Sequence, residues 1–239
     1  GIVHPSPNLP EWTEVELRHM LSAALDLPVR LENDANAAAY AEFIVGAARG
    51  AKNAIVLTLG TGVGGGIILG GRLYRGSSFA GEVGHMTIET DGRPCPCGNT
   101  GCLERYTNAD SMVERASLIL DEGRESVLKE AHAEGRLTSR DVGRAAADGD
   151  PVAVEAVRET GRALGVGLAN LAVLFDPDLI VLGGGVAKAG RPLFEAAEEE
   201  MVRRGYGSTI HSPRLLPAEL EETAGAVGAA LLARDEPTA

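Results

Sequence analysis

Residues 53–76 read NAIVLTLGTGVGGGIILGGRLYRG, and this stretch decides the fold class. Two runs of aliphatic and β-branched residues, AIVLTL and GIILG, flank a glycine cluster at residues 60–66. Such runs favour β-strands, and glycine favours the tight turn that joins two antiparallel strands. The stretch therefore predicts a β-hairpin with a glycine-rich turn.

The rest of the chain combines further strands with several helices. DPDLIVLGGGV at residues 176–186 predicts a buried strand that runs into three glycines, and the short run PVRLEN at residues 28–33 suggests another strand. Apolar periodicity and alanine content predict helices at residues 14–27, 35–48, 151–175, 191–204 and 223–233, with polar helices between 108 and 150. Strands that alternate with long helices indicate the α/β fold class.

Two segments have a distinctive composition. Residues 1–13 carry three prolines, which predicts an extended start to the chain. In the helix at residues 151–175, Gly161, Gly165 and Gly167 leave a smooth face. Because glycine has no side chain, we expect another backbone to pack close against this face.

The overall composition argues against several classes of protein. The chain has 239 residues and a formal net charge of −12, which disfavours nucleic acid as its main partner. No apolar run reaches the roughly 18 residues that a membrane span needs. The chain has three cysteines, an odd number, so a reducing compartment is expected rather than a secreted disulfide framework. We therefore expect a cytoplasmic protein without membrane contact.

All three cysteines lie in one loop, GEVGHMTIETDGRPCPCGNTGC at residues 81–102. Together with His85, the thiols of Cys95, Cys97 and Cys102 form a set of nitrogen and sulfur ligands that suits tetrahedral zinc. The alternative is a loop with small buried cysteines. A disulfide is disfavoured, because Cys95 and Cys97 are too close in the chain to bridge easily. The loop therefore predicts a structural zinc site.

The glycine clusters and Asp34 allow more than one interpretation when each is taken alone. Backbone amides of the turn at residues 60–66 suit phosphate oxygens, but a hairpin turn favours glycine in any case. The glycines at residues 183–185 also fit a plain strand-to-helix turn. Asp34 precedes an alanine-rich helix, where it fits an N-cap, and it equally fits a carboxylate that accepts the proton of a hydroxyl group.

Several motifs together resemble one known family. GEVGHM followed by CPCGNTGCLE is similar to the signature of the ROK family of repressors, open reading frames and sugar kinases. The resemblance extends to LPVRLENDANAAAYAE, TLGTGVGGGIILGGRLYRG and DPDLIVLGGGV, covers nearly the whole chain, and is closest to the bacterial glucokinases of that family. It implies an actin-like ATPase (ribonuclease H-like) fold with two lobes that close on a sugar and ATP. The implied activity is ATP-dependent phosphorylation of a hexose, glucose to glucose 6-phosphate in the first place.

The resemblance also implies roles for individual residues. It makes Asp34 the catalytic base, with zinc bound at His85, Cys95, Cys97 and Cys102. The sugar would lie against Asn33, Asp34, Glu82, His85 and Glu104. The phosphates, bridged by Mg²⁺, would lie at Gly60, Thr61, Gly62 and Gly64, and the adenosine at Gly183, Gly184 and Gly185. Glu32 is expected to be structural.

The N-terminal part departs from the family pattern. Kinases of the family open with an Asp-x-Gly-x-Thr phosphate loop, and this sequence contains no such motif. We therefore expect residues 1–33 to be the remnant of an incomplete N-terminal lobe, and residues 34–221 to form the C-terminal lobe with the zinc loop 81–104. The C-terminal helix within residues 222–239 is expected to pack back on the remnant. One side of the ATP cleft is then missing, so we expect this chain to turn over poorly or not at all.

Other functions fit the same motifs. A ROK repressor would share the zinc and sugar sites, although the intact glycine turn and Asp34 favour a kinase. A kinase for fructose, mannose or N-acetylmannosamine would share the pocket residues. Polyphosphate is an alternative donor, and a zinc-stabilised binding module without catalysis is the simplest alternative. The resemblance also implies a homo-oligomer, either a dimer or a tetramer.

Overall fold

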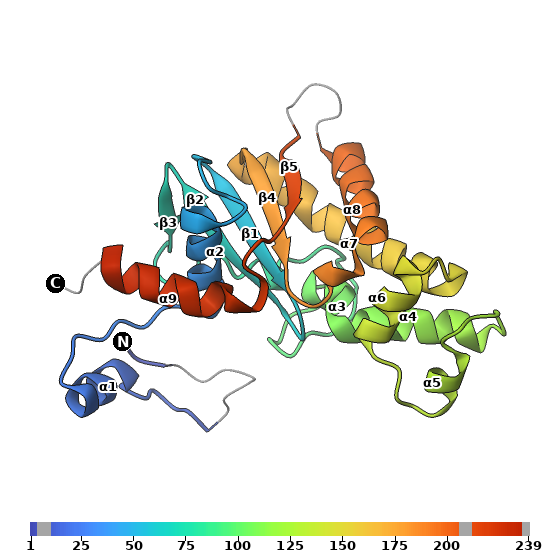
Figure 1. Ribbon diagram of the computed structural model, residues 1–239, viewed down its shortest axis with the longest axis horizontal. Helices are drawn as coiled ribbons and strands as arrows, with labels where there is room; N and C mark the ends of the chain where they lie inside the picture. The colour runs from blue at the N-terminus through green and yellow to red at the C-terminus, as the bar shows by residue number, and fades with distance from the viewer. Residues whose placement is uncertain (4–10, 206–211, 236–239) are drawn as a thin grey trace.

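The computed structural model describes residues 1–3, 11–205 and 212–235, and its centre is a mixed five-stranded sheet (Figure 1). The order across the sheet is β3-β2-β1-β4-β5. The strands are β1 (Ala54–Leu59), β2 (Val63–Leu69), β3 (Arg72–Tyr74), β4 (Leu179–Gly183) and β5 (Arg214–Pro217).

β1 and β2 form the hairpin that the sequence predicts. They pair antiparallel with Leu59 opposite Val63, so Gly60, Thr61 and Gly62 make up the turn. β1 also pairs with β4, in parallel. The carboxyl ends of β1 and β4 therefore lie at the same edge of the sheet, which is the edge where parallel strands usually carry their ligands.

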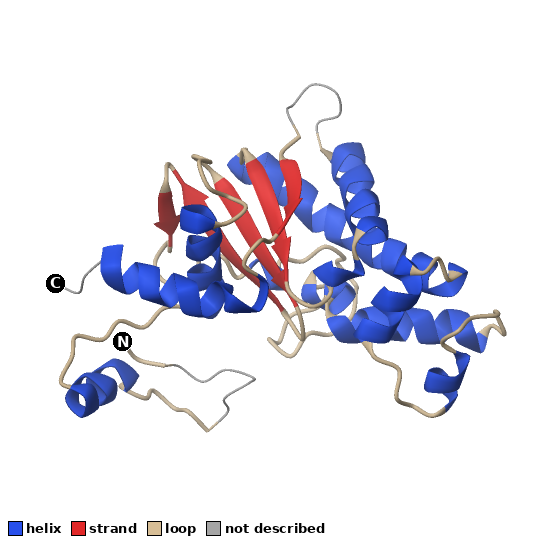
Figure 2. Cartoon of the chain, in the orientation of Figure 1, coloured by secondary structure: helices blue, strands red, loops and turns tan. Residues whose placement is uncertain are grey.

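Helices cover both faces of the sheet (Figure 2). Along β1, Ala54 and Val56 pack with α2 and α9, whereas Ile55, Leu57 and Leu59 pack with α4, α6, α7 and α8. This alternation is what a strand buried on both faces requires. The helical segments are α1 (Leu17–Leu25), α2 (Asp34–Val45), η1 (Val83–His85), α3 (Glu104–Thr107), α4 (Ala109–Asp121), α5 (Lys129–Ala133), α6 (Ser139–Ala147), α7 (Pro151–Phe175), η2 (Ala187–Ala189), α8 (Arg191–Arg204), η4 (Glu221–Thr223) and α9 (Ala224–Asp235).

Glycines allow α7 and α8 to pack closely. A Cβ on Gly161 would lie 2.6 Å from the carbonyl oxygen of Leu193, and a Cβ on Gly165 would lie 2.5 Å from that of Ala197. No side chain fits between backbones that approach so closely. The predicted approach of a second backbone to this face of α7 is therefore confirmed.

α9 packs along α2. The hydroxyl of Tyr40 donates a hydrogen bond to the carboxylate of Asp235 at 3.1 Å, and a Cβ on Gly228 would overlap the carbonyl of Ala37. α1 lies apart from the sheet and buries none of its residues (Figure 1). The division of the chain into a remnant lobe of residues 1–33 and a lobe of residues 34–221 stays a prediction.

Some details differ from the sequence-based expectations. Residues 28–33 are all described and none belongs to a strand, so the strand predicted there is wrong. Pro28 has no N–H to donate to a neighbouring strand, and Glu32 binds the start of α2 instead. Residues 4–10 of the segment predicted as extended lie outside the described residues. Within the described ranges, no helix combines the length and the apolar character needed to cross a membrane.

Candidate functional site

His85, Cys95, Cys97 and Cys102 form one cluster. Each offers a ligand atom, and these atoms all lie within 4.8 Å of one another. Nδ1 of His85 is 3.7 Å from Sγ of Cys95, and the Sγ atoms of Cys97 and Cys102 are 3.7 Å apart. In a tetrahedral site with bonds of about 2.0–2.3 Å, neighbouring ligand atoms are about 3.5–3.8 Å apart. The donor set and its spacing therefore fit a zinc ion.

Short-range hydrogen bonds shape the loop that carries the thiols. The N–H of Cys95 donates to the carbonyl of Asn99 at 2.8 Å, and the N–H of Gly98 donates to the carbonyl of Cys95 at 3.0 Å. Burial, followed by the neighbouring thiols of Cys97 and Cys95, raises the pKa of the Cys102 thiol to about 12. A bound metal reverses this effect, because thiols that coordinate a metal are deprotonated.

Acidic side chains surround this cluster. His85 turns Nδ1 towards the cluster, and its Nε2 lies 4.0 Å from the carboxylate of Glu82. Glu104 begins α3 and holds Oε1 3.9 Å from Sγ of Cys95. Its Oε2 accepts a hydrogen bond from the N–H of Val63 at 3.0 Å. Of the predicted sugar-binding residues, the structure thus gathers Glu82, His85 and Glu104 around the cysteine loop.

Asn33 and Asp34 lie at the start of α2. The side chain of Asn33 accepts a hydrogen bond from the N–H of Asn36 at 3.0 Å, so Asn33 is the N-cap of this helix. Asp34 is the first helical residue, and its Oδ1 accepts from the N–H of Ala35 at 2.8 Å. The carboxylate is exposed. Asp34 therefore does not serve as the N-cap, and its carboxylate stands where a ligand can reach it.

Glu32 fixes the start of α2. Its Oε1 accepts hydrogen bonds from the N–H of Asn33 at 3.2 Å and from Nδ2 of Asn36 at 3.0 Å. Its Oε2 accepts from Nε of Arg75 at 2.7 Å. Glu32 is therefore structural, as expected, and it holds the Asn33–Asp34 pair in place.

The glycines of β2 let two parts of the site approach the same strand. A Cβ on Gly64 would lie 2.8 Å from Cβ of Ala35 in α2, and a Cβ on Gly65 would lie 2.8 Å from the carbonyl oxygen of Gly81. Successive residues of a strand face opposite sides. Gly64 therefore packs against α2 and Gly65 against the segment that leads into η1. This segment also reaches α2, because a Cβ on Gly81 would lie 3.7 Å from Oδ1 of Asn36. Packing already explains the glycine at position 64, whose predicted phosphate contact stays a prediction.

The backbone of the turn between β1 and β2 offers donors and no free carbonyl group. The carbonyl groups of Gly60, Thr61 and Gly62 all accept hydrogen bonds from within the protein. Within the described part of the chain, the N–H groups of Thr61 and Gly62 have no partner. Free backbone amides at a glycine turn attract anions. The arrangement suits the oxygen atoms of a phosphate group.

A cavity of about 760 Å³ lies where β4 ends, at the edge of the sheet that also carries this turn. Gly183, Gly184 and Gly185 line it where β4 ends, together with residues of α6, η2 and the segment 217–222. The N–H of Val186 donates to the carbonyl of Leu59 at 3.0 Å, which ties the end of β4 to the end of β1. The turn and the cavity are therefore neighbours at one edge of the sheet.

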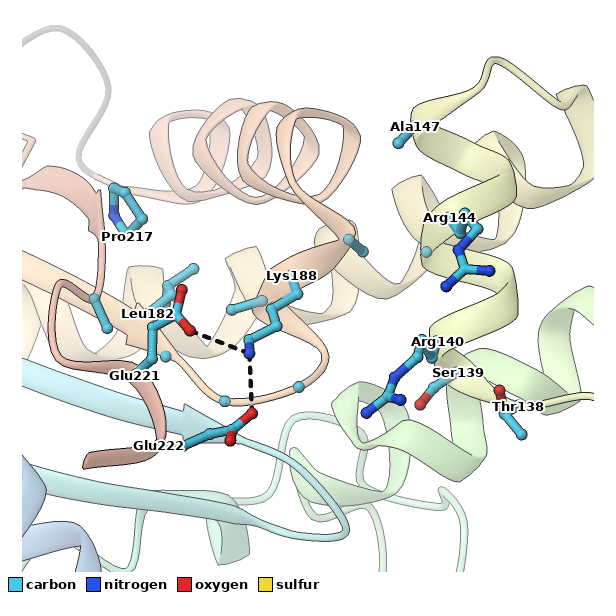
Figure 3. Close-up of a pocket in the computed structure, with 17 residues that line it drawn as sticks. Thr138, Ser139, Arg140, Arg144, Ala147, Leu182, Lys188, Pro217, Glu221 and Glu222 are labelled. Atoms are coloured by element: carbon cyan, nitrogen blue, oxygen red, sulfur yellow. Dashed lines mark hydrogen bonds and ion pairs between the residues drawn. The ribbon is translucent and has the colours of Figure 1, made fainter. Parts of the chain in front are cut away.

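Charged side chains face the cavity from two sides (Figure 3). Lys188 pairs with Glu222 at 3.1 Å and with Glu221 at 3.2 Å, and these carboxylates raise the pKa of Lys188. Arg140 and Arg144 extend from α6 on the other side. Neither guanidinium has a hydrogen bond or ion pair to a described residue. The cavity therefore suits a ligand that carries negative charge.

The sequence did not indicate Asn108 as a residue of the site. Its Nδ2 donates to the carbonyl of Thr61 at 2.9 Å, and its Oδ1 caps α4. An Asn before a helical pattern signals an N-cap. The bond to Thr61 joins positions 47 residues apart, so no local pattern reveals it.

Known proteins similar to nearly the whole chain include glucokinases and xylose repressors. A family model described as "ROK family" matches residues 1–236. The chain is 38% identical over 246 residues to a glucokinase of Streptomyces coelicolor, covering 98% of this chain and 75% of that protein. It is 32% identical over 218 residues to the xylose repressor of Bacillus subtilis, covering 91% of this chain and 53% of that protein.

A solved structure agrees with the fold. The ROK family glucokinase from Streptomyces griseus, in complex with glucose and AMPPNP, superposes with a TM-score of 0.86 and 38% identity, covering 95% of this chain and 74% of that chain. ROK sugar kinases have the actin-like ATPase fold, and the fold class expected from the sequence is confirmed.

Proposed function

The chain belongs to the ROK family, and on that premise we propose that it transfers the terminal phosphoryl group of ATP to a hexose, with glucose as the substrate and glucose 6-phosphate as the product. Similarity to glucokinases supports sugar phosphorylation. The observation that carries the proposal is the Gly60–Gly62 turn, because the free amides of Thr61 and Gly62 lie at the same edge of the sheet as a cavity that suits an anionic ligand. Sensing a sugar alone does not require free backbone donors for phosphate at this turn.

In this proposal Asp34 is the general base. Its carboxylate orients the sugar hydroxyl and accepts the proton as the phosphoryl group is transferred. Asn33, Glu82, His85 and Glu104 hold the remaining hydroxyl groups of the sugar.

The donor lies across the turn and the cavity. Its phosphates accept hydrogen bonds from the amides of Thr61 and Gly62, and its adenosine lies against Gly183, Gly184 and Gly185. Positive charge on the α6 side of the cavity favours the anionic donor. Mg²⁺ accompanies the phosphates, as is usual in transfers of this kind.

The cysteine loop supports the sugar side of the site. His85, Cys95, Cys97 and Cys102 would hold zinc, and the bound ion would stabilise a loop that has little hydrophobic core of its own. With Nδ1 of His85 on the metal side, Nε2 remains for a sugar hydroxyl beside Glu82.

The proposal is tested by ADP release with ATP and a panel of glucose, fructose, mannose and N-acetylmannosamine. We expect release with glucose at the highest kcat/KM of the panel. If another sugar exceeds glucose, the activity class stands and the substrate is corrected. Because the chain lacks the Asp-x-Gly-x-Thr phosphate loop, the assay is repeated with residues 1–239 joined to an N-terminal lobe that carries it. If no sugar supports ADP release in that form either, the kinase proposal is wrong.

The similarity to xylose repressors supports a second candidate, a regulator that senses a sugar. The sugar and metal sites serve either function, so nucleotide binding separates the two. A protein that binds sugar but neither ATP nor ADP fits the regulator. One that binds both ligands together fits the kinase.

A further inference from the structure

The beginning of α4 holds two carbonyl groups of the glycine turn. The carbonyl of Gly60 accepts a hydrogen bond from the N–H of Ala109 at 2.8 Å. The carbonyl of Thr61 accepts from Nδ2 of Asn108 at 2.9 Å. The third carbonyl, that of Gly62, accepts from the N–H of Gly60 at 2.9 Å and closes the turn. Asn108, the N-cap of α4, and Ala109, its first residue, therefore hold two adjacent peptide groups of the turn in place.

The orientation of the free amides follows from these two bonds. A trans peptide is planar, so its C=O and the N–H of the next residue point in opposite directions. The carbonyl of Gly60 shares a peptide group with the amide of Thr61, and the carbonyl of Thr61 shares one with the amide of Gly62. Because α4 holds both carbonyls inward, both amides face outward, towards the position of a phosphate.

The side chain of Asn108 does more than a helix cap requires. Its Oδ1 accepts from the N–H of Ser111 at 2.9 Å while its Nδ2 donates to Thr61, and the residue is only 4% exposed. Asp, Ser and Thr cap helices about as well as Asn. Of these four side chains, only the amide of Asn carries its acceptor and its donor on separate atoms, which can reach two partners at once. The choice of Asn is therefore explained by the bond to the turn.

We propose that Asn108 and Ala109 are positioning residues for the phosphoryl donor, because they keep the amides of Thr61 and Gly62 directed at its phosphates. This inference rests on the proposed function, since it requires a donor at the turn. Gly60 and Gly62 flank Thr61 and permit its peptide to rotate. Without the bond from Asn108, rotation turns the carbonyl of Thr61 towards the phosphate, and the two acceptors repel each other.

Two substitutions test the inference without removing the cap. Asn108→Asp keeps the acceptor for α4 and replaces the donor by an oxygen that faces the carbonyl of Thr61. Ala109→Pro removes the N–H that holds Gly60 and suits the helix, because proline is favoured at the first helical position. The extended backbone of Asn108, with φ −79° and ψ 174°, is compatible with a following proline. Ser111→Ala is the matched control, since Ser111 Oγ bonds the carbonyl of Asn108 at 2.9 Å and does not touch the turn.

The measurements are calorimetric titrations with MgADP and, separately, with glucose, together with the thermal midpoint. We expect Asn108→Asp and Ala109→Pro each to weaken MgADP binding by roughly tenfold, while glucose affinity changes by less than about twofold. Ser111→Ala should bind MgADP as the wild type does. Unchanged MgADP affinity in both variants overturns the inference alone, as does a parallel loss of glucose and MgADP affinity. A wild type that binds no MgADP, even when residues 1–239 are joined to an N-terminal lobe with the phosphate loop, overturns the proposed function together with the inference.

Discussion

Glu104 accepts a hydrogen bond from the N–H of Val63 at 3.0 Å, so the first residue of α3, two positions after Cys102, contacts the strand that follows the glycine turn. The other oxygen of the same carboxylate lies 3.9 Å from Sγ of Cys95. One side chain therefore joins the candidate metal cluster to the candidate phosphate turn. A change at the metal cluster, such as loss of the ion, is therefore expected to alter the binding of the phosphoryl donor as well as the binding of the sugar.

Two substitutions of Glu104 should separate its two roles. Glu104→Ala leaves the N–H of Val63 without its acceptor, so we expect both donor and sugar affinity to fall by about tenfold. Glu104→Gln keeps a carbonyl oxygen for Val63 and loses the charge, so sugar affinity should fall while donor affinity stays near that of the wild type. Titrations with MgADP and glucose measure both. Equal effects of the two variants on the donor would contradict the link through Val63.

The second prediction is that the protein binds zinc and that removal of the ion weakens glucose binding. The purified protein should contain about one zinc per chain by elemental analysis, because the four ligand atoms complete one tetrahedral site. Chelation should lower the thermal midpoint and weaken glucose binding by at least about tenfold, since His85 and the loop lose their support. Re-addition of zinc should restore both. Intact glucose affinity in metal-free protein would show that the loop is ordered without the ion.

The parts of the fold that the sequence predicted are those with local signals. β1, β2 and β4 are runs of aliphatic residues beside glycine clusters, and α7 and α8 begin and end where the periodicity places them. β5 was not predicted, because it has four residues and ends at Pro217. Residues 28–33 resemble a strand in composition, but a strand exists only where a neighbour pairs with it.

The candidate site likewise has one part that local sequence patterns predict and one part that they do not. The four residues of the cysteine loop are close in sequence, so their spacing alone indicated a common ligand. The bonds from Asn108 to Thr61 and from Glu104 to Val63 join segments 47 and 41 positions apart. Such bonds depend on how helices and sheet pack together, and no pattern within either segment reveals them. The sequence therefore indicates the candidate metal ligands, but not the bonds that hold the glycine turn and the start of β2 in place.

Gly184 should be intolerant of a side chain. Its φ is +87°, and a Cβ would overlap the carbonyl oxygen of Leu59 and lie 2.7 Å from its nitrogen. Gly184→Ala is therefore expected to lower the free energy of unfolding by about 2–4 kcal/mol, measured by urea titration. Gly185→Ala is the matched control, because a Cβ there meets nothing within 4 Å. Equal stability of the two variants would show that the backbone relaxes at Gly184.

Glu200 should make stability depend on pH. Hydrogen bonds from Arg203 in the first place, and from Arg204, lower the pKa of Glu200 to about 2. A carboxylate whose pKa falls on folding stabilises the protein above its unfolded pKa, which is 4.5 here, and loses this contribution as the pH falls towards 2.

We therefore expect Glu200→Gln to lower the free energy of unfolding by on the order of 1 kcal/mol at pH 7. The difference from the wild type should shrink below pH 4.5 and disappear near pH 2. Urea titrations over this range measure it. Glu198→Gln, an exposed carboxylate on the same helix, should cause little change at any pH. A constant difference across the range would mean that packing, not charge, explains the effect.

Asp34→Asn should separate catalysis from binding. In the wild type, the N–H of Ala35 donates a hydrogen bond of 2.8 Å to Oδ1 of Asp34. Asn retains an oxygen that can accept this bond, and Asn33 continues to cap α2, so the helix should be unaffected. The variant has no carboxylate to accept a proton. We expect kcat for glucose to fall by about 10²–10⁴-fold, while the dissociation constant for glucose changes by less than about threefold.

Asp110→Asn is the matched control, because Asp110 is also an exposed aspartate in the first turn of a helix and has no role in the proposed site. Its kcat should equal that of the wild type. A loss of glucose affinity in Asp34→Asn that matches the loss of kcat would make Asp34 a sugar ligand rather than a base. A kcat within tenfold of the wild type would remove Asp34 from the mechanism. Glu32, two residues before it, could not replace it as a base, because its carboxylate already accepts hydrogen bonds from Asn33, Asn36 and Arg75.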